Sequence, residues 1–188
     1  MKYILEHLDG RLYKWCWLEY KHASDTVGKK NIIFTNVKGT VAASKLETIG
    51  RVGIKSVITQ KLKNVCVLDP QASKVLTTAD CKKFDYMIFG GVLGNHPMDG
   101  RTKTALSDNI KCSVRNLGPV QMSTNTAVLV VKMIADGAKF SEIKFIDEIE
   151  IETGKNESQI FPYRYVLKNG KPVLPDGLIE FLKKRRGF

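Results

Sequence analysis

The amino-acid sequence predicts an α/β fold with a mostly parallel β-sheet flanked by helices. Apolar runs such as NIIFTNV (31–37) and NVCVLDP (64–70) are typical of buried strands. They alternate with segments of helical pattern, and this alternation is typical of a parallel sheet. With 188 residues, the chain is long enough to bury its own core as one domain with a small appendage.

The predicted elements follow one another in a regular order. Strands are expected at residues 1–8, 31–37, 64–70, 85–91 and 111–118, and helices at residues 11–27, 41–50, 77–84 and 119–137. Gly28, Gly50 and Gly137 stop three of these helices, and Thr77 is placed to cap the other. Toward the C-terminus, the pattern predicts strands within residues 142–153 and 160–175, a hairpin turn at Asn169-Gly170 and a final helix at 176–186.

Composition narrows the class of protein and its partners. Lysine and arginine outnumber aspartate and glutamate by 30 to 19, which gives a net charge of +11. Such a field attracts phosphate-rich partners such as RNA or ribosomes, although it also serves solubility alone. No apolar run approaches the roughly 18 residues of a membrane span, and the N-terminus lacks the apolar stretch of a secretory signal. A cytoplasmic protein is therefore expected.

The four cysteines, Cys16, Cys66, Cys81 and Cys112, are scattered along the chain. They form no CxxC pair, and no paired histidines stand at metal spacing. We therefore expect buried thiols in a reducing compartment and no bound metal.

Two glycine-containing loops, at residues 89–102 and 115–126, follow predicted strands, and ligands bind at the carboxyl ends of strands in parallel sheets. Glycine lets backbone groups approach a ligand closely because it has no Cβ. The first loop, FGGVLGNHPMDGRT, does not match the dinucleotide pattern GxGxxG, and neither loop has the GK[ST] of a phosphate loop. The loops therefore suit a ligand held by backbone groups, such as an adenine, with plain tight turns as the alternative.

Three stretches together resemble one enzyme class. FGGVLGNHPMDGRT, RNLGPVQMSTNTAVLVVKMI and the opening MKYILEHLD with its later LEY are similar to the SPOUT class of S-adenosylmethionine-dependent methyltransferases. The closer resemblance is to the branch with the fungal SPOUT protein-arginine methyltransferase and archaeal relatives labelled RNA methyltransferases. It implies a deep C-terminal trefoil knot, a rare exception to the rule against threaded chains, within a methyltransferase domain at 1–147. Residues 148–188 would form a β-hairpin and a basic helix packed on that domain.

The resemblance also implies that S-adenosylmethionine sits in the knot with its adenine against the loop backbones. The contacts would come from Gly90, Gly91, Leu93, Gly94, Asn95 and His96 in the first loop, and from Asn116, Leu117, Gly118, Gln121, Met122 and Thr124 in the second. The first loop departs from the family's pattern, because Asn95 stands where a carboxylate is usual and Met98 where a proline is. This departure puts any role for an acid at position 95 in question.

Methyl transfer from a sulfonium is an in-line displacement, to which a protein contributes alignment and electrostatics. An arginine acceptor is protonated at neutral pH, so carboxylates are needed to hold it and to take up its proton. Glu6, Asp9 and Glu19 are the candidate catalytic acids. Trp15 lies near Glu19 in the sequence, and an arginine stacks well on an aromatic ring. The alternative is that Glu19 is a solvated helix acid paired with lysines and that the tryptophan belongs to the core.

Two arginines are candidate substrate-binding residues. Arg101 would meet the donor's carboxylate or cap its own loop, and Arg115 would meet the substrate or help to close the second loop. His96 is expected to belong to the donor loop rather than to act as a base, and His7 and His22 are expected to be structural.

These features predict a methyltransferase that acts on a protein arginine, and the branch resemblance implies a ribosomal protein as its target. The first alternative is an rRNA or tRNA methyltransferase of the same fold, because the net charge of +11 suits either acceptor. The second is an inactive ribosome- or RNA-binding assembly factor, which Asn95 keeps open. A monomer is favoured over a dimer formed through the knot, since the C-terminal extension would cover the dimer surface.

Overall fold

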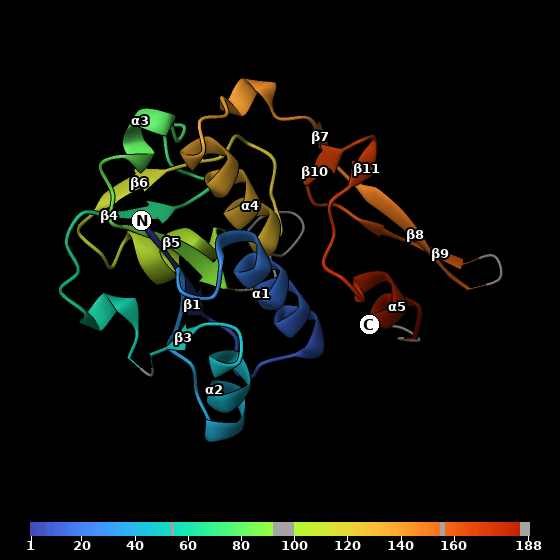
Figure 1. The fold of residues 1–188 in the computed structure, drawn as a ribbon, viewed down its shortest axis with the longest axis horizontal. Helices are drawn as coiled ribbons and strands as arrows, with labels where there is room; N and C mark the ends of the chain where they lie inside the picture. Colours follow the sequence, from blue (N-terminus) through green and yellow to red (C-terminus); the bar gives the residue numbers. More distant parts are fainter. Residues whose placement is uncertain (54, 92–99, 155–156, 185–188) are drawn as a thin grey trace.

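The computed structural model describes residues 1–53, 55–91, 100–154 and 157–184, and its main feature is a six-stranded sheet (Figure 1). The strands lie in the order β3-β2-β1-β5-β4-β6, and every neighbouring pair is parallel. Their bounds are Lys2–His7 for β1, Ile32–Thr35 for β2, Arg51–Val52 for β3, Val65–Leu68 for β4, Tyr86–Gly91 for β5 and Ser113–Arg115 for β6. The predicted α/β fold with a mostly parallel sheet is confirmed.

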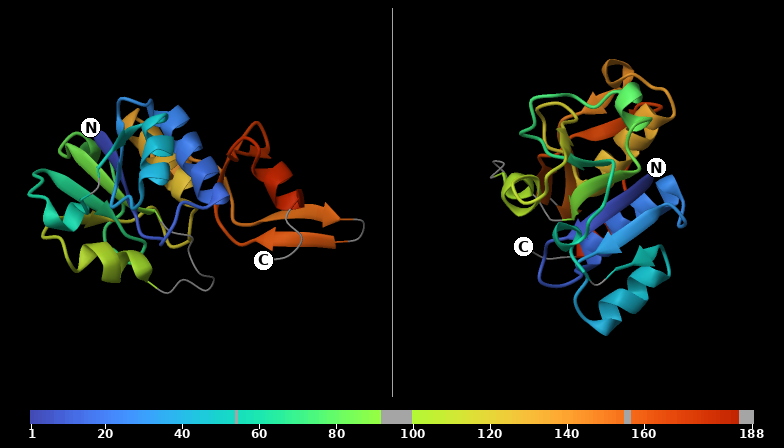
Figure 2. Two further views of the ribbon diagram at one scale, coloured as in Figure 1. Left: turned by 90° about the horizontal axis from the view of Figure 1, so that it is seen from below. Right: turned by 90° about the vertical axis from the view of Figure 1, so that its left-hand side faces the viewer.

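Helices cover both faces of this sheet (Figure 1 and Figure 2). The α-helices here are α1 (Lys14–Val27), α2 (Thr40–Glu47), α3 (Thr78–Cys81) and α4 (Thr124–Ala135), with short helices η1 (Val57–Thr59) and η3 (Phe140–Glu142) and the π-helix η2 (Lys103–Ser107). Side chains alternate between the faces of a strand. Tyr3 and Leu5 of β1 therefore join the core that includes α1 and α4, whereas Ile4 packs with Val57 of η1 and Leu106 of η2 on the other face.

The C-terminal part of the chain adds two small sheets and a helix. They are the antiparallel sheet of β7 (Phe145–Ile146), β10 (Tyr165–Lys168) and β11 (Lys171–Pro172), the hairpin of β8 (Ile149–Gly154) and β9 (Glu157–Phe161), and α5 (Leu178–Lys184). Asn169 and Gly170 make the predicted turn, both with positive φ. Figure 2 shows the hairpin and α5 projecting beyond one end of the main sheet. The domain boundary at residue 148 stays a prediction, and β7 before it pairs with β10 after it.

The segment predicted as a helix from residue 119 becomes helical only at Thr124. Residues 119–123 form a loop instead, held to the C-terminal part of the chain by a bridge between Met122 and Arg164. The backbone N–H of Arg164 also donates to the carbonyl of Gln121 at 2.8 Å. These tertiary contacts override local helix propensity. No sequence pattern predicts β3, η1 or η2, which are too short to show one, and the trefoil knot stays a prediction.

Cys16, Cys66 and Cys81 are buried thiols, as predicted, and Cys112 is half-buried. Burial raises the pKa of the Cys66 thiol to about 12 and that of Cys81 to about 11, which keeps both protonated and unreactive at neutral pH. Within the described residues, no helix is both long and apolar enough to cross a membrane.

Candidate active site

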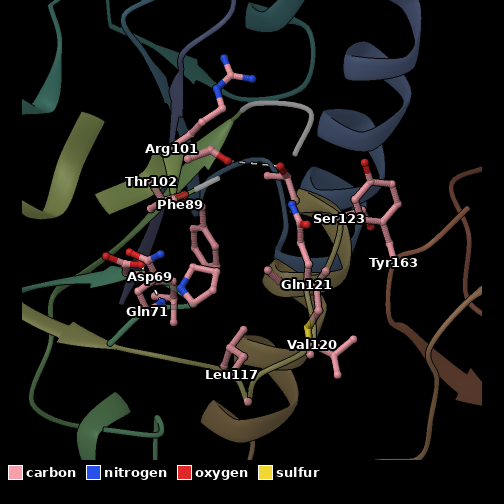
Figure 3. A pocket seen from close by; sticks show the side chains of 18 of the residues that line it. Asp69, Gln71, Phe89, Arg101, Thr102, Leu117, Val120, Gln121, Ser123 and Tyr163 are labelled. Atoms are coloured by element: carbon pink, nitrogen blue, oxygen red, sulfur yellow. Dashed lines mark hydrogen bonds between the residues drawn. The ribbon is translucent and has the colours of Figure 1, made fainter. Parts of the chain in front are cut away.

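A cavity opens at the carboxyl ends of β4 and β5, beside the loop that leads into α4 (Figure 3). Its wall is built from segments far apart in the sequence: one residue of α1, the ends of β4 and β5, the residues just before η2, the second loop with the start of α4, and Tyr163 from the C-terminal part. The cavity therefore lies where parallel sheets bind their ligands.

The cavity has apolar walls with a few polar groups between them. Asp69, almost fully buried after β4, accepts hydrogen bonds from the Ser107 hydroxyl at 2.6 Å and from the backbone N–H of Gln71 at 2.9 Å. The side-chain oxygen of Gln121 is buried and has no hydrogen-bond partner among the described residues. A buried acceptor of this kind in a cavity wall suits a donor on a bound molecule. The apolar lining includes Leu68, Phe89, Leu117, Val120 and Met122.

Two glycines with positive φ shape the cavity. Gly118, with φ of +85°, faces the ring of Phe140, which an added Cβ would approach to 2.9 Å. Gly100, with φ of +73°, packs on the side chain of Gln71, which an added Cβ would approach to 3.0 Å. Any other residue at these positions would be strained and would displace a neighbour.

The structure brings about half of the predicted donor contacts to the cavity. Those that line it are Gly90, Leu117, Gly118, Gln121, Met122 and Thr124. Gly91 lies behind the lining, where its carbonyl accepts hydrogen bonds from the Tyr20 hydroxyl at 3.2 Å and the backbone N–H of Leu8 at 3.1 Å. Asn116 is also outside the lining and fixes the bend of the second loop, since it donates to the carbonyl of Ala72 at 2.6 Å and accepts from the N–H of Gly118 at 2.9 Å. Leu93, Gly94, Asn95 and His96 lie outside the described residues.

Glu19 is the catalytic candidate that lines the cavity. Its side chain is buried at the N-terminus of α4, where the carboxylate accepts hydrogen bonds from the backbone N–H groups of Thr124 and Asn125. Burial raises the pKa of Glu19 to about 7; the two hydrogen bonds oppose this rise, and the charge of Asp9 adds to it. Glu19 is therefore a carboxyl that gains or loses a proton near neutral pH, and not a solvated helix acid.

Asp9 lies beside the cavity and faces Arg101. The Oδ1 atom of Asp9 is 3.8 Å from Nη2 of Arg101, and Oδ2 is buried without a hydrogen-bond partner among the described residues. Because Arg101 lines the cavity, this pair connects the turn after β1 to the residues that precede η2. The roles predicted for Arg101, as a contact for the donor or a cap for its loop, stay predictions.

Glu6 lies away from the cavity. Its carboxylate is fully buried on the face of the sheet opposite α1 and accepts hydrogen bonds from the Thr35 hydroxyl at 2.5 Å, the Ser56 hydroxyl and the backbone N–H of Val57 at 3.1 Å. These contacts join β1 to β2 and to η1. The geometry thus gives Glu6 a role in the fold, and its predicted catalytic role stays without support.

Trp15 and Arg115, predicted as substrate contacts, also lie outside the cavity lining. Trp15 is half-buried on α1 and stacks on Tyr13, with 6.1 Å between the ring centroids. Arg115 donates to both carboxylate oxygens of Asp80, at 2.9 Å and 3.0 Å, and lies over the ring of Phe84. The Arg115 hydrogen bonds lower the pKa of Asp80 to about 2. Arg115 therefore joins β6 to α3 in this structure.

Both histidines expected to be structural have side-chain partners. Nδ1 of His7 is 3.0 Å from the Tyr20 hydroxyl, and Nδ1 of His22 is 3.0 Å from the amide nitrogen of Asn125. Burial lowers the pKa of each ring. Among the described residues, no group of three or more His, Cys, Asp or Glu side chains is arranged to hold a metal ion.

Several lining residues have no place among the sequence-predicted contacts, and Asp69, Gln71 and Tyr163 are three of them. Asp69 and Gln71 follow the apolar run of β4, so the rule that ligands bind at the carboxyl ends of strands is a signal that points to them. Tyr163 carries no such signal, because it reaches the cavity from a segment between β9 and β10, two strands of different small sheets near the C-terminus.

Comparisons with known proteins agree with this geometry. A family model described as "Protein arginine N-methyltransferase SFM1-like" matches residues 2–187. Protein arginine N-methyltransferase SFM1 of Saccharomyces cerevisiae is 37% identical over 204 residues, which covers 98% of this chain and 95% of the yeast protein. The crystal structure of yeast arginine methyltransferase SFM1 complexed with SAH matches with a TM-score of 0.87 at 37% identity, covering 96% of this chain and 94% of that chain.

A more distant likeness concerns the fold alone. Dual specific Trm10 from Thermococcus kodakaraensis matches with a TM-score of 0.57 at 16% identity, covering 76% of this chain and 96% of that chain.

Proposed function

The chain belongs to the SFM1-like family of protein arginine N-methyltransferases, and from this premise we propose that it methylates an arginine side chain of a protein with S-adenosylmethionine as the donor. The predicted SPOUT class is confirmed by the same comparisons, and the related yeast enzyme has been crystallised with SAM and with SAH. Within the molecule, the observation that carries the proposal is Glu19, a buried carboxyl with a pKa of about 7 in the cavity wall.

The residues of the cavity fit this donor. The unpaired acceptor of Gln121 beside apolar walls suits an adenine, whose exocyclic amine donates hydrogen bonds. The positive-φ glycines Gly100 and Gly118 leave room for a ligand near the backbone. Asp69 offers carboxylate oxygens to hydroxyl or ammonium groups. When bound, S-adenosylmethionine supplies an electrophilic methyl group on a sulfonium.

Glu19 is placed to hold the acceptor and to take its proton. A guanidinium has a pKa above about 12 and is protonated at neutral pH, so its nitrogens have no free lone pair for attack. The ionised Glu19 carboxylate accepts hydrogen bonds from the guanidinium and receives the proton that the attacking nitrogen loses. That nitrogen gains a methyl group and gives up one proton, so the acceptor keeps its single positive charge. The N–H groups of Thr124 and Asn125 fix the carboxylate in place meanwhile.

The charge of the segment that leads to Tyr163 favours a protein acceptor over an RNA acceptor. Between residues 142 and 161 the chain has six acidic and two basic residues, although its net charge is +11. This acidic segment leads directly to Tyr163 in the cavity wall. An acidic surface attracts a cationic peptide and repels phosphates. We propose a ribosomal protein as the target, with the basic surface elsewhere on the enzyme facing neighbouring rRNA.

Tritium transfer from labelled S-adenosylmethionine to host ribosomes and to total host RNA tests the proposal. Label that survives ribonuclease, is lost to protease and appears as methylarginine after acid hydrolysis is the expected result. Label lost to ribonuclease would replace the proposal with the RNA methyltransferase. Donor binding without any transfer would replace it with the inactive assembly factor.

We also propose that the enzyme acts as a monomer, because the C-terminal part packs on α1 through contacts such as the Lys14 ammonium over the Phe181 ring, 5.6 Å from its centroid. Light scattering should give the mass of one chain, 21.1 kDa. A stable twofold assembly would contradict this.

A further inference from the structure

Among the residues that the structure describes, the C-terminal part of the chain reaches the cavity through one side chain, Tyr163. This residue is half-buried and lies between the end of β9 and the start of β10. It lines the cavity together with Glu19, and Figure 3 shows it on the same side as Ser123, across from Phe89 and Asp69. The tyrosine therefore stands on the side of the cavity formed by the second loop, away from the ends of β4 and β5 (Figure 3).

The residue after Tyr163 fixes its position. The backbone N–H of Arg164 donates to the carbonyl of Gln121 at 2.8 Å, which joins the segment to the second loop. The Arg164 guanidinium donates to both oxygens of Asp147, from Nε at 2.6 Å and from Nη2 at 3.0 Å, and lies 5.0 Å from the centroid of the Phe145 ring. With backbone and side chain both anchored, the neighbouring tyrosine ring is held at the cavity wall before any ligand arrives.

Tyr163 and Glu19 share one electrostatic environment. The pKa of the Tyr163 phenol is raised by burial and, next, by the negative charge of Glu19. Burial and, next, the same carboxylate raise the pKa of Tyr165, although that residue belongs to the buried core and does not line the cavity. Tyr163 is thus an aromatic ring that lies close to the acid and is also open to the cavity.

We propose that Tyr163 determines acceptor specificity, its ring and the Glu19 carboxylate forming a slot for the guanidinium group of the target arginine. A guanidinium is planar, so its face stacks on an aromatic ring while its edge donates to a carboxylate. A ring paired with a single point of negative charge favours such a cation over a neutral base flanked by phosphates. This inference rests on the proposed arginine methyltransferase activity and adds a residue and a geometry to it.

Steady-state methylation of acid-extracted host ribosomal protein tests the inference with three variants. Tyr163→Leu removes the ring and is expected to raise the KM for the protein acceptor about tenfold, the size of a partly desolvated cation–π contact. Tyr163→Phe keeps the ring and should restore the KM to within about threefold of the unchanged enzyme. Tyr13→Leu, at an exposed aromatic residue outside the cavity lining, is the matched control.

Calorimetric binding of S-adenosylhomocysteine separates an acceptor role from a donor role. The dissociation constant should stay within about twofold of the wild-type value in every variant, since the ring is assigned to the acceptor. Weaker donor binding by Tyr163→Leu with an unchanged acceptor KM would overturn the inference, as would a Tyr163→Phe variant as impaired as Tyr163→Leu. If Tyr163→Leu does not fold, Tyr163→Met takes its place under the same criteria. A wild-type enzyme that forms no methylarginine would overturn the proposed function itself, a result distinct from these.

Discussion

Glu6 and Glu19 are both buried carboxylates, yet they lie on opposite faces of the main sheet and have different surroundings. Glu6 is met by the hydroxyls of Thr35 and Ser56 and by a backbone N–H, all from elements that pack against β1. Glu19 receives two backbone N–H groups from the start of α4, and it lines the cavity.

The difference teaches that burial alone does not make a catalytic acid. The donors around Glu6 come from two segments, β2 and the start of η1, so its carboxylate joins parts of the fold together. The donors around Glu19 come from one helix end and hold the group in place, while the cavity leaves it accessible to a ligand. The pKa of about 7 gives Glu19 the proton affinity that general-base chemistry at neutral pH needs.

The largest effect is expected from Glu19→Gln. The amide keeps the shape of the side chain but cannot take a proton, so kcat should fall by at least about 100-fold. Single-turnover tritium transfer to acid-extracted ribosomal protein measures it, with Glu47→Gln, at an exposed acid on α2, as the control. A Glu19→Gln enzyme within threefold of wild-type activity would remove Glu19 from the mechanism.

The same substitution is expected to stabilise the protein in alkaline solution. The pKa of Glu19 is raised from 4.5 to about 7 on folding, so ionising it costs the folded state free energy that is absent below pH 4.5 and complete above pH 7. Replacing the acid by a neutral amide removes this cost, which is roughly 3 kcal/mol. Urea unfolding at pH 5 and pH 8 should show the advantage of Glu19→Gln growing with pH; an advantage that shrinks with pH would contradict the burial argument.

Glu6→Gln should have the reverse effects: it should destabilise the protein and leave its activity nearly unchanged. The amide would direct N–H groups at the donors of Thr35, Ser56 and Val57, and one or more would lose its partner. We expect a loss of about 2 kcal/mol in the free energy of unfolding. The kcat/KM of the folded variant should stay within about threefold of wild type, because Glu6 does not line the cavity. A stable but inactive Glu6→Gln enzyme would restore the catalytic role predicted from the sequence.

The fold follows closely from the sequence because four strands of the main sheet, β1, β2, β4 and β5, are built on apolar runs. The helix predicted from residue 119 shows where local sequence pattern fails to predict the structure. Gln121 and Met122 are held by contacts with Arg164 and do not belong to a helix. The conformation of that loop depends on contacts between two segments distant in the sequence, and no local sequence signal predicts these contacts.

The candidate site was likewise predictable only in part from the sequence. Glu19 and Gln121 were predictable from residue type and resemblance, and both line the cavity. Glu6 has the same residue type and a comparable place near the N-terminus, but the alternation of side chains along β1 turns it to the other face. Tyr163 depends on how the C-terminal part docks, which no periodic pattern encodes.

The smallest effect is expected from a substitution at Asp9, and it tests directly how a neighbouring charge changes the pKa of Glu19. The negative charge of Asp9 raises the pKa of Glu19 and is the last in size of the contributions, so Asp9→Asn should lower that pKa by less than burial raises it. Since Glu19 must be ionised to accept a proton, activity rises with pH near its pKa, and the midpoint of the kcat/KM profile should move toward acid. Asp25→Asn is the control, because Asp25 lies on α1, the helix that also holds Glu19, but pairs with Lys21 in solvent. A midpoint that moves toward alkali would mean that Asp9 acts mainly through Arg101, which it faces at 3.8 Å, and not through its own charge.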